Sequence, residues 1–330
     1  MLYQILPFAQ LSDIQLIDEI TVTNSLTCLT ISQFENMIFN PPIINDNFDP
    51  LNTCDPDENL LSDLHVMPPS NHYHQSELKA VLDSTETGLS IMFHNIRSIP
   101  NNLESFFIQH LVSVQSNLQI IGLSETRLTD DIEHMYTISG FNLFTTNRNR
   151  QGGGVALYIK QNIKCKIISD MCMKTDTFES VFVEYIVDSR PETVGVIYRR
   201  PNSDISSFIE LLADLLNIIK SNKNICHIIG DFNIDLLKYE SSKYVQNFVN
   251  TFYGHGFHPC TNKPTRVSSC SASIIDHIWS NDLKVNRTNG ILLTDISDHF
   301  APFTCRKKVQ QSVNIPVTIT YRDYKKKQQR

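Results

Sequence analysis

Three features that would place the chain in a common class are missing from its sequence. No apolar run approaches the roughly 20 residues that a membrane-spanning helix needs. The eight cysteines include no Cys-x-x-Cys pair and follow no regular spacing, which argues against zinc fingers and against a disulfide framework. The N-terminal stretch has no basic start and carries Pro7 and Gln10 among its apolar residues, unlike a signal peptide. We therefore expect a protein of the nucleus and/or the cytoplasm that is not secreted and has no membrane partner.

Basic residues are almost missing from the first part of the chain. Residues 1–88 contain 13 Asp and Glu but a single basic residue, Lys79, which gives a net charge of −12. Turn formers such as Asn40-Pro41-Pro42 recur there, and the apolar clusters are short. Charge of one sign with low hydrophobicity is typical of disorder. Residues 89–330 instead carry 22 acidic and 27 basic residues, a balance of +5 that only weakly indicates a nucleic-acid partner.

This shift in composition predicts three parts. They are an acidic, largely disordered leader over residues 1–88, a folded domain over residues 89–306, and a basic tail or truncated linker over residues 307–330.

A nucleotide-type phosphate loop is also missing. The triplet Gly152-Gly153-Gly154 precedes an apolar strand instead of following one, and no Gly-Lys-Ser/Thr accompanies it. We expect these glycines to shape a tight turn or to allow a close approach of two backbones.

Apolar, β-branched runs and segments of helical periodicity follow one another from residue 89 onward, which predicts an α/β fold. The clearest helix is capped by Ser203 or Asp204 and places apolar residues at helical spacing as far as Ile219. We expect further helices beginning at Asn101 or Asn102 and spanning residues 244–252. The predicted strands are 89–93, 118–123, 141–145, 155–159, 163–168, 181–187, 194–198, 225–233, 274–279, 291–293 and 300–305.

Polar residues able to do chemistry stand at six of the strand ends. They are Asn95, Glu125, Tyr198, the pair Asp231 and Asn233, Asp276, and the pair Asp298 and His299. Each alone has an ordinary explanation as a turn, a surface acid or a core residue. Their shared position at the ends of otherwise apolar strands indicates one cleft, where converging carboxylates repel one another. A divalent cation such as Mg²⁺ relieves that repulsion.

The stretch Gly230-Asp231-Phe232-Asn233 is the most informative of these ends. A carboxylate at Asp231 can orient a water or take its proton. An amide at Asn233 can hold a phosphoryl oxygen without adding negative charge. An Asx turn that closes the strand explains the same residues without any chemistry.

Seven motifs occur in order along residues 89–306. They are His94-Asn95-Ile96-Arg97-Ser98, Leu123-Ser124-Glu125-Thr126, Gly152-Gly153-Gly154-Val155-Ala156, Ile197-Tyr198-Arg199-Arg200-Pro201-Asn202, Gly230-Asp231-Phe232-Asn233, Ile275-Asp276-His277-Ile278 and Ser297-Asp298-His299. Together they resemble the endonuclease/exonuclease/phosphatase superfamily, and more narrowly the apurinic-type endonuclease domain of non-LTR (LINE-like) retrotransposons. The resemblance implies a four-layer α/β/β/α sandwich of two mixed β-sheets, with the site at one end.

The resemblance also implies a role for each candidate residue. Glu125 binds the essential Mg²⁺ (or Mn²⁺) with Asn95 near it, and Asp298 assists metal binding or the leaving group. Asp231 orients or deprotonates the attacking water, helped by Asn233. His299 contacts the scissile phosphate while Asp276 holds its ring, and Tyr198 donates to the phosphate. The neighbouring Arg199, Thr265 and Arg266 are expected to bind an extended polyanionic substrate.

Two positions and the C-terminal end depart from relatives. Arg127 stands where related elements often carry Trp. Arg97 stands where repair-type relatives carry an acid, which favours the retrotransposon branch. The chain contains no reverse transcriptase domain, and Tyr321-Arg322-Asp323-Tyr324 resembles the start of the linker to one. We therefore expect a fragment, a truncated copy or an endonuclease-only product.

These expectations combine into a function. We predict a metal-dependent hydrolase, an endonuclease that nicks one strand of DNA by water attack on a phosphodiester, as in target-primed retrotransposition. The alternatives are a phosphoesterase of the same fold acting on phosphoinositides, sphingolipids or nucleotides, and a non-catalytic nucleic-acid-binding remnant. The loops 147–152 and 261–273 are candidates to enter a DNA groove, with Arg148, Arg150 and Arg266 as phosphate contacts.

Overall fold

The computed structural model describes residues 70–84, 87–112, 117–222, 224–268, 270–283 and 286–307. The first 69 residues and those after residue 307 lie outside this range, so the predictions of a disordered leader and of a basic tail or truncated linker stay predictions. None of the helices within the described range has both the length and the apolar character that a bilayer crossing requires.

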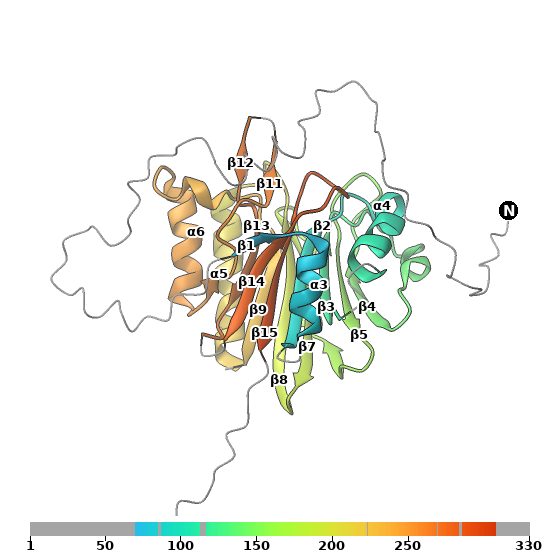
Figure 1. Ribbon diagram of the computed structural model, residues 1–330. Coiled ribbons are helices and arrows are strands. Elements are labelled where there is room, and N and C mark those ends of the chain that lie inside the picture. The colour runs from blue at the N-terminus through green and yellow to red at the C-terminus, as the bar shows by residue number, and fades with distance from the viewer. Residues whose placement is uncertain are drawn as a thin grey trace, which may run out of the picture. The chain divides into compact units, whose positions relative to one another are not determined.

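Two mixed β-sheets form the middle of the domain (Figure 1). The first has seven strands in the order β1 (Asn71–Tyr73), β14 (Arg287–Leu292), β15 (Ala301–Lys307), β2 (Thr87–Asn95), β3 (Ile120–Ser124), β5 (Val155–Lys160) and β4 (Phe141–Thr146). The second has six strands in the order β10 (His258–Pro259), β13 (Asp276–Ser280), β9 (Ile225–Asp231), β8 (Arg190–Arg199), β7 (Phe178–Val187) and β6 (Cys165–Ile167). A separate hairpin consists of β11 (Arg266–Val267) and β12 (Ala272–Ser273).

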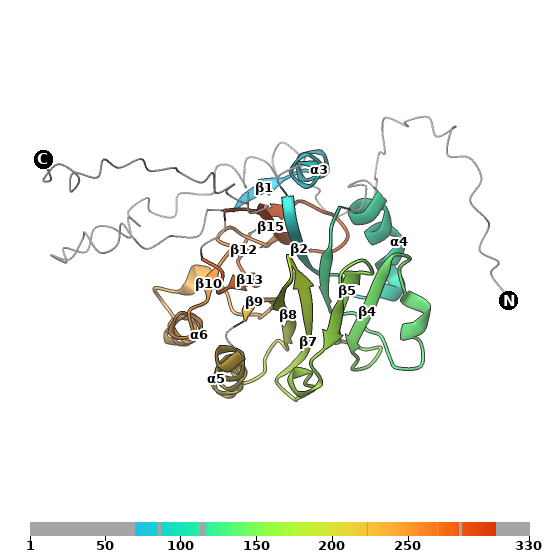
Figure 2. The same ribbon diagram turned by 90° about the horizontal axis from the view of Figure 1, so that it is seen from below.

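Helices cover the outer faces of both sheets, as the end-on view in Figure 2 makes plain. The α-helices among the described residues are α3 (Gln75–Asp83), α4 (Ile99–Phe106), α5 (Ile205–Asn222) and α6 (Lys243–Gly254). A π-helical turn, Phe107–Val112, extends α4, and short 3-10 turns span Glu133–Tyr136, Ser169–Met171 and Leu236–Lys238. α3 and α4 pack on the seven-stranded sheet, and α5 and α6 pack on the six-stranded sheet. The predicted four-layer α/β/β/α sandwich is confirmed.

Alternation of side chains along the strands explains why the sandwich has three apolar layers. On β2, Ile91 and Phe93 face the other sheet, whereas Met92 between them faces α3 and α4. The inter-sheet layer tolerates little extra volume at Gly122 on β3. A Cβ atom there would lie 2.6 Å from Cδ1 of Ile229 and 2.7 Å from Cγ2 of Val196, both on the opposite sheet. The absence of a side chain at Gly122 therefore leaves room for Ile229 and Val196 of the opposite sheet.

The parallel strand pairs bring the predicted site residues to one end of the sandwich. β2 and β3 are parallel, with Asn95 opposite Ser124 in register, so Glu125 follows directly beside Asn95. β8 and β9 are parallel, with Tyr198 opposite Asp231. β13 runs antiparallel to β9 and places Asp276 opposite Asp231.

The domain begins earlier than the predicted start at residue 89. β1 pairs in parallel with β14, and α3 buries Leu78 and Leu82 in the outer layer of the seven-stranded sheet. These two leucines are four residues apart and so lie on one helix face. The prediction of disorder rested on the average composition of the acidic segment. That average does not reveal a short apolar stripe such as Leu78 and Leu82.

The glycine triplet has the second of its two predicted functions. Gly153 and Gly154 both have positive φ values, +76° and +86°, and their carbonyl groups accept the backbone N–H groups of Arg127 and Thr126. A Cβ on Gly154 would lie 2.5 Å from Oγ1 of Thr126. The triplet therefore lets the backbone before β5 approach the loop that carries Glu125.

The helix boundaries differ slightly from those predicted. α4 begins at Ile99 rather than at Asn101 or Asn102. Pro100 fits the first turn of a helix, because a backbone N–H there would have no hydrogen-bond acceptor within the helix. α5 begins at Ile205, and Asp204 accepts the backbone N–H of Ser207 through Oδ2. This bond confirms the predicted cap.

Two buried histidines, His94 on β2 and His110 in the π-helical turn, contact each other at 3.1 Å between Nδ1 and Nε2. Burial lowers the pKa of His110 to about 4. Burial, with the charge of His110, lowers the pKa of His94 well below its ordinary value. Below about pH 6.5 the unfolded chain gains protons at both rings while the folded chain does not. The free energy of unfolding therefore falls as the pH is lowered from 6.5 towards 4.

The free energy of unfolding should drop between about pH 7 and about pH 4.5 in both proteins. We expect this drop to be about 2 kcal/mol smaller in a His110→Asn variant than in the unaltered chain. Urea denaturation at the two pH values measures the difference. The exposed His134 provides the matched control, and His134→Asn should leave the pH dependence as it is. Equal losses in the His110 variant and in the unaltered chain would contradict the prediction.

Candidate active site

Asn95 connects the two sheets at the centre of the candidate site. Its Nδ2 donates to Oε1 of Glu125 at 2.9 Å and to Oδ2 of Asp231 at 2.8 Å. Asn95 and Glu125 come from the seven-stranded sheet, whereas Asp231 ends β9 of the six-stranded sheet. One amide thus holds two carboxylates that would otherwise repel each other. The structure brings these three predicted residues together.

Asp231 is almost fully buried, with 1% of its surface exposed. Its second oxygen, Oδ1, accepts the backbone N–H of Asn233 at 2.9 Å. Burial raises the pKa of Asp231 to about 7, and the charge of Asp276 adds to this effect, although His299 and the two hydrogen bonds oppose it. A carboxyl group with a pKa near neutrality is suited to accept a proton from water.

Asp276 and His299 form the second contact between the sheets. Nδ1 of His299 lies 2.9 and 3.0 Å from the two carboxylate oxygens of Asp276, and both residues are buried. Burial by itself lowers the pKa of His299, but the charge and the hydrogen bond of Asp276, with help from Asp231 and Asp298, raise it to about 9. The structure brings these two predicted residues together, and the contact with Asp276 orients the ring of His299.

Asp298 lies between two arginines. Its Oδ1 is 2.9 Å from Nη1 of Arg97, and its Oδ2 is 2.7 Å from Nη2 of Arg266. Burial raises the pKa of Asp298, but His299 and the two arginines outweigh this effect and lower it. A carboxylate held by two cations is a poor partner for a third cation, so this geometry does not favour the predicted metal-binding role of Asp298.

Tyr198 and Glu125 lie side by side. The Tyr198 hydroxyl lies near the carboxylate of Glu125. Burial, with the charges of Glu125 and Asp231, raises the pKa of Tyr198 above its ordinary range. Glu125 has a positive φ of +50°, and Nη2 of Arg127 lies 3.7 Å from its Oε2. Tyr198 therefore remains a neutral donor beside the carboxylate.

Arg199 is not placed to bind substrate, contrary to the prediction. It is 3% exposed, and its guanidinium group donates to the backbone carbonyl groups of Phe232, Asn233 and Ser203. The side-chain amide of Asn233 in turn donates to the carbonyl group of Arg199 at 2.8 Å. These bonds fix the loop after β9, so Arg199 holds in place the segment that follows Asp231. Asn233 contacts Asp231 through its backbone N–H.

Thr265 also has a structural role in place of the predicted contact with substrate. It is fully buried, and its Oγ1 accepts the backbone N–H groups of Ile275 and Asp276. Arg148 pairs with the buried Glu179, so it does not reach outward as a phosphate contact. Arg150 is exposed, and Arg266 is half exposed beside Asp298.

Two residues, Ser297 and His94, have a positioning role that the sequence analysis did not predict. Oγ of Ser297 donates to the carbonyl group of Asn95 at 2.7 Å and accepts the backbone N–H of His299 at 3.1 Å. Nε2 of His94 lies 3.0 Å from the carbonyl oxygen of His299. The signal in the sequence is that each residue opens one of the seven motifs, directly before Asp298 and Asn95 respectively.

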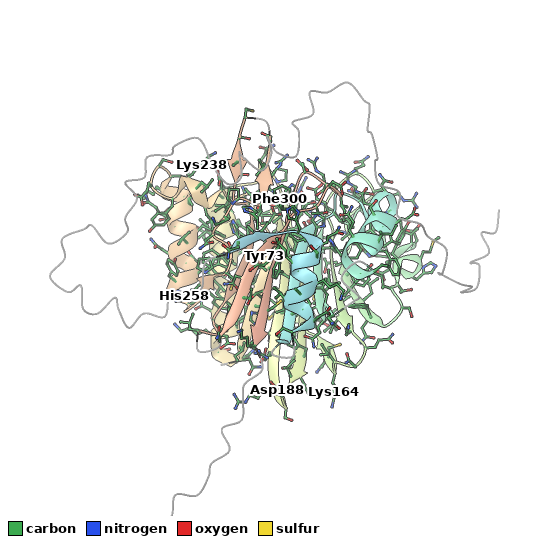
Figure 3. The ribbon with its side chains drawn as sticks, viewed as in Figure 1. Tyr73, Lys164, Asp188, Lys238, His258 and Phe300 are labelled. Carbon is green, nitrogen blue, oxygen red and sulfur yellow. The ribbon has the colours of Figure 1, made fainter. Side chains whose placement is uncertain are left out.

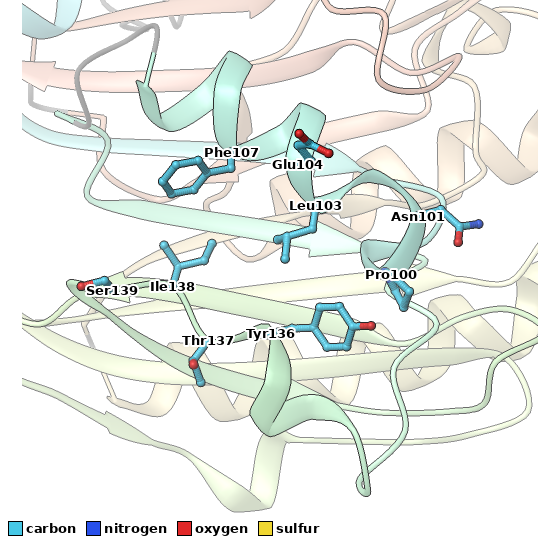
Figure 4. A pocket seen from close by; sticks show the side chains of 9 residues that line it. All are labelled: Pro100, Asn101, Leu103, Glu104, Phe107, Tyr136, Thr137, Ile138 and Ser139. Carbon is cyan, nitrogen blue, oxygen red and sulfur yellow. The ribbon is translucent and has the colours of Figure 1, made fainter. Parts of the chain in front are cut away.

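A hollow on the outer face of the seven-stranded sheet is separate from this site. It lies between α4 and residues 136–139, with Leu103, Phe107 and Ile138 on its walls (Figure 4). Its lining includes none of the predicted site residues. The chemistry therefore belongs to the strand ends and not to this hollow.

The family model described as "Endonuclease/Exonuclease/phosphatase family" matches residues 92–299, which is more than half of the chain. The chain belongs to the endonuclease/exonuclease/phosphatase family. It is thus a metal-dependent phosphoesterase, a hydrolase. No curated protein was found to match it.

Solved structures of the endonuclease/exonuclease/phosphatase fold resemble the domain. The endonuclease domain of TRAS1, a telomere-specific non-LTR retrotransposon, has a TM-score of 0.52 at 15% identity over 68% of this chain and 100% of that chain. The catalytic domain of human Nocturnin has a TM-score of 0.49 at 17% identity over 68% and 95% of the two chains. A mannosyl-6-phosphatase of Bacteroides thetaiotaomicron has a TM-score of 0.49 at 14% identity over 66% and 98%. The likeness to the TRAS1 domain shows the fold.

The donor atoms of this family member fit a hard divalent cation. Asp231, Asp276 and His299 each offer a ligand atom, and these atoms lie within 4.8 Å of one another. Glu125, which accepts from the same Nδ2 of Asn95 as Asp231 does, adds a further carboxylate. A set dominated by carboxylate oxygens suits Mg²⁺ or Mn²⁺ better than a softer metal.

Proposed function

We propose that this domain is a Mg²⁺- or Mn²⁺-dependent DNA endonuclease that hydrolyses one phosphodiester of a strand. One observation carries the proposal. The hydrogen-bonded set Glu125–Asn95–Asp231 stands directly beside the His299–Asp276 pair, and arginines border the set. A base, a cationic donor and oxygen ligands in one place are the parts that phosphodiester hydrolysis requires.

Each residue has a definite task in this proposal. Asp231 accepts a proton from the attacking water as its oxygen bonds to phosphorus, and Asn95 and the Asn233 N–H keep the carboxylate aimed. His299 and the Tyr198 hydroxyl donate to phosphoryl oxygens, where negative charge increases in the transition state. The bond from phosphorus to the leaving oxygen then breaks, that oxygen takes up a proton from solvent, and Asp231 returns to solvent the proton that it accepted.

Glu125 would hold the metal ion, and Nδ2 of Asn95 orients its carboxylate. When bound, the ion supplies electrostatic stabilisation of the phosphoryl oxygens. Asp298 is the weaker candidate ligand because Arg97 and Arg266 already neutralise it.

The border of the site supports a polyanionic substrate. Arg97, Arg127 and Arg266 are each between one-third and one-half exposed, and each lies beside a site carboxylate. Arg97 and the seven sequence motifs favour the branch of LINE-like retrotransposon endonucleases, and the TRAS1 endonuclease domain is among the similar folds. We therefore prefer DNA over a small phosphoester as the substrate.

Nicking of supercoiled plasmid tests the proposal. We expect the purified chain to relax the plasmid in the presence of Mg²⁺ or Mn²⁺, to lose this activity in EDTA, and to regain it when the metal is restored. Bis(4-nitrophenyl) phosphate, an inositol phosphate and a nucleoside monophosphate are assayed beside the plasmid. Turnover of one of the monophosphates without nicking would favour a phosphatase, and DNA binding without any turnover would favour a non-catalytic remnant.

A further inference from the structure

The contacts of Asp298 contain an excess of positive charge. One carboxylate pairs with two guanidinium groups, Arg97 through Nη1 and Arg266 through both Nε and Nη2. The two arginines come from separate segments, the β2–α4 loop and the β11–β12 hairpin. The set therefore carries a net charge of +1 next to His299, whose Nε2 lies 3.9 Å from Oδ1 of Asp298.

Both arginines present part of their side chain to solvent. The side chain of Arg97 is 45% exposed and that of Arg266 is 41% exposed. A guanidinium group has five N–H donors, and the contacts with Asp298 use only some of them. Each arginine can therefore accept a second anion while Asp298 continues to orient it.

The backbone fixes the two arginines close to the chemistry. Arg266 forms an antiparallel β-bridge with His299. Arg97 follows Asn95 by two residues and has a φ of +50°, and Ser98 after it has a φ of +108°. The N–H of Ser98 donates to the carbonyl group of Glu125 at 2.8 Å, which holds this strained loop against the metal-binding loop.

A purely stabilising role does not account for this arrangement. Half-exposed ion pairs contribute little to stability. Two successive residues with positive φ, neither of them glycine, are costly and are found mainly at functional sites. A stabilising cluster would also balance its charges, whereas this one leaves one positive charge in excess beside His299.

We propose that Arg97 and Arg266 form a clamp, oriented by Asp298, that binds the phosphates flanking the scissile phosphate of a polynucleotide. The clamp makes the enzyme select a chain of phosphodiesters over an isolated phosphoester. This inference rests on the proposed function. It adds two specificity residues, and it reassigns Asp298 from metal ligand to orienting group.

The test compares two substrates in one protein preparation. The double variant Arg97→Gln with Arg266→Gln is assayed with an oligonucleotide and with bis(4-nitrophenyl) phosphate, which has a single phosphate. We expect kcat/KM for the oligonucleotide, divided by kcat/KM for bis(4-nitrophenyl) phosphate, to fall about 10- to 100-fold. The reason is that two charge-assisted phosphate contacts are lost. The slope of log affinity for the oligonucleotide against log salt should fall by about two. A ratio is unaffected by any fraction of the variant that fails to fold.

The matched control removes two positive charges at the other end of the domain. Arg190→Gln with Lys164→Gln has the same change in net charge, and Figure 3 shows Lys164 at the end opposite to Phe300, the neighbour of His299. The ratio should stay constant in this control. The variant Arg97→Lys with Arg266→Lys should restore the salt slope, since a lysine also neutralises a phosphate.

The outcomes separate this inference from the proposed function. A constant ratio in the double arginine variant overturns the clamp, because the arginines then act only on the chemistry that both substrates share. An equal fall in the control variant also overturns it, because the effect is then one of net charge. If the unaltered chain turns over bis(4-nitrophenyl) phosphate but neither binds nor cuts the oligonucleotide, the proposed DNA substrate is wrong and the clamp is wrong with it.

Discussion

An Asp231→Asn variant is expected to lose phosphodiester hydrolysis by a factor of about 10²–10⁴. The substitution keeps the size of the side chain and an oxygen that can accept the N–H of Asn233. It removes the negative charge and, with it, the ability to take a proton from water. kcat should therefore fall far more than KM rises.

The same variant is expected to be at least as stable as the unaltered chain. The pKa of Asp231 in the folded chain is raised above its ordinary value, so folding disfavours its charged form. The unfolded chain gives up this proton at lower pH, and Asp231 therefore destabilises the fold increasingly as the pH rises towards its folded pKa. Removing the charge relieves both the burial cost and the repulsion from Asp276. Sites of this kind commonly trade stability for activity.

Activity and thermal unfolding are measured together on each protein. Asp188→Asn is the matched control, because this aspartate lies in an exposed turn at the far end of the domain (Figure 3). It should change neither quantity. Retention of more than about a tenth of the activity by Asp231→Asn would exclude this residue as the base.

A Gly230→Ala variant is expected to fold poorly or not at all. A Cβ at this position would lie 1.8 Å from the carbonyl oxygen of Ile197 and 2.8 Å from its carbonyl carbon. Both atoms belong to the backbone of the neighbouring strand β8, which is hydrogen-bonded in the middle of the sheet and cannot move aside as a side chain can. We expect a loss of more than about 4 kcal/mol, a large part of the stability of a typical domain.

Urea denaturation and soluble yield measure this effect. Gly152→Ala is the control, because a Cβ there has no heavy atom within 4 Å. The control should shift the unfolding midpoint little. If the two alanine variants unfold at similar urea concentrations, the close approach of β8 and β9 at Gly230 is not a constraint on the fold.

The sequence was sufficient to predict which strand ends meet at the candidate site. Apolar runs ending in Asn95, Glu125, Asp231 and Asp276 predict buried strands, and parallel pairing brings such ends together. The helical spacing of apolar residues likewise predicts the buried face of α5. Both the apolar runs of the strands and this spacing are local features of the sequence. Boundaries were less well predicted, as the start of α4 illustrates.

The errors have a physical cause in the direction of side chains. Tyr198 faces the inter-sheet layer and the site, so the next residue on the strand, Arg199, must face the other way. Arg199 accordingly lies over the ring of Phe208 on α5, with 6.0 Å from its Cζ to the ring centroid. A period-two argument would have excluded it as a substrate ligand. The pairing of Arg97 with Asp298 joins residues 201 positions apart, which no local pattern indicates.

The hydrogen bonds from Asn95 to Asp231 and from His299 to Asp276 both cross from one sheet to the other. The candidate catalytic groups are therefore carried by both sheets and meet at the seam, the layer where the two sheets face each other. Catalytic geometry must be held to within about 0.5 Å. The turnover rate thus reports how well the two halves of the sandwich are aligned. A side chain added between the two sheets, as at Gly122, can displace one sheet relative to the other. Such a variant would lose activity although every strand remains folded.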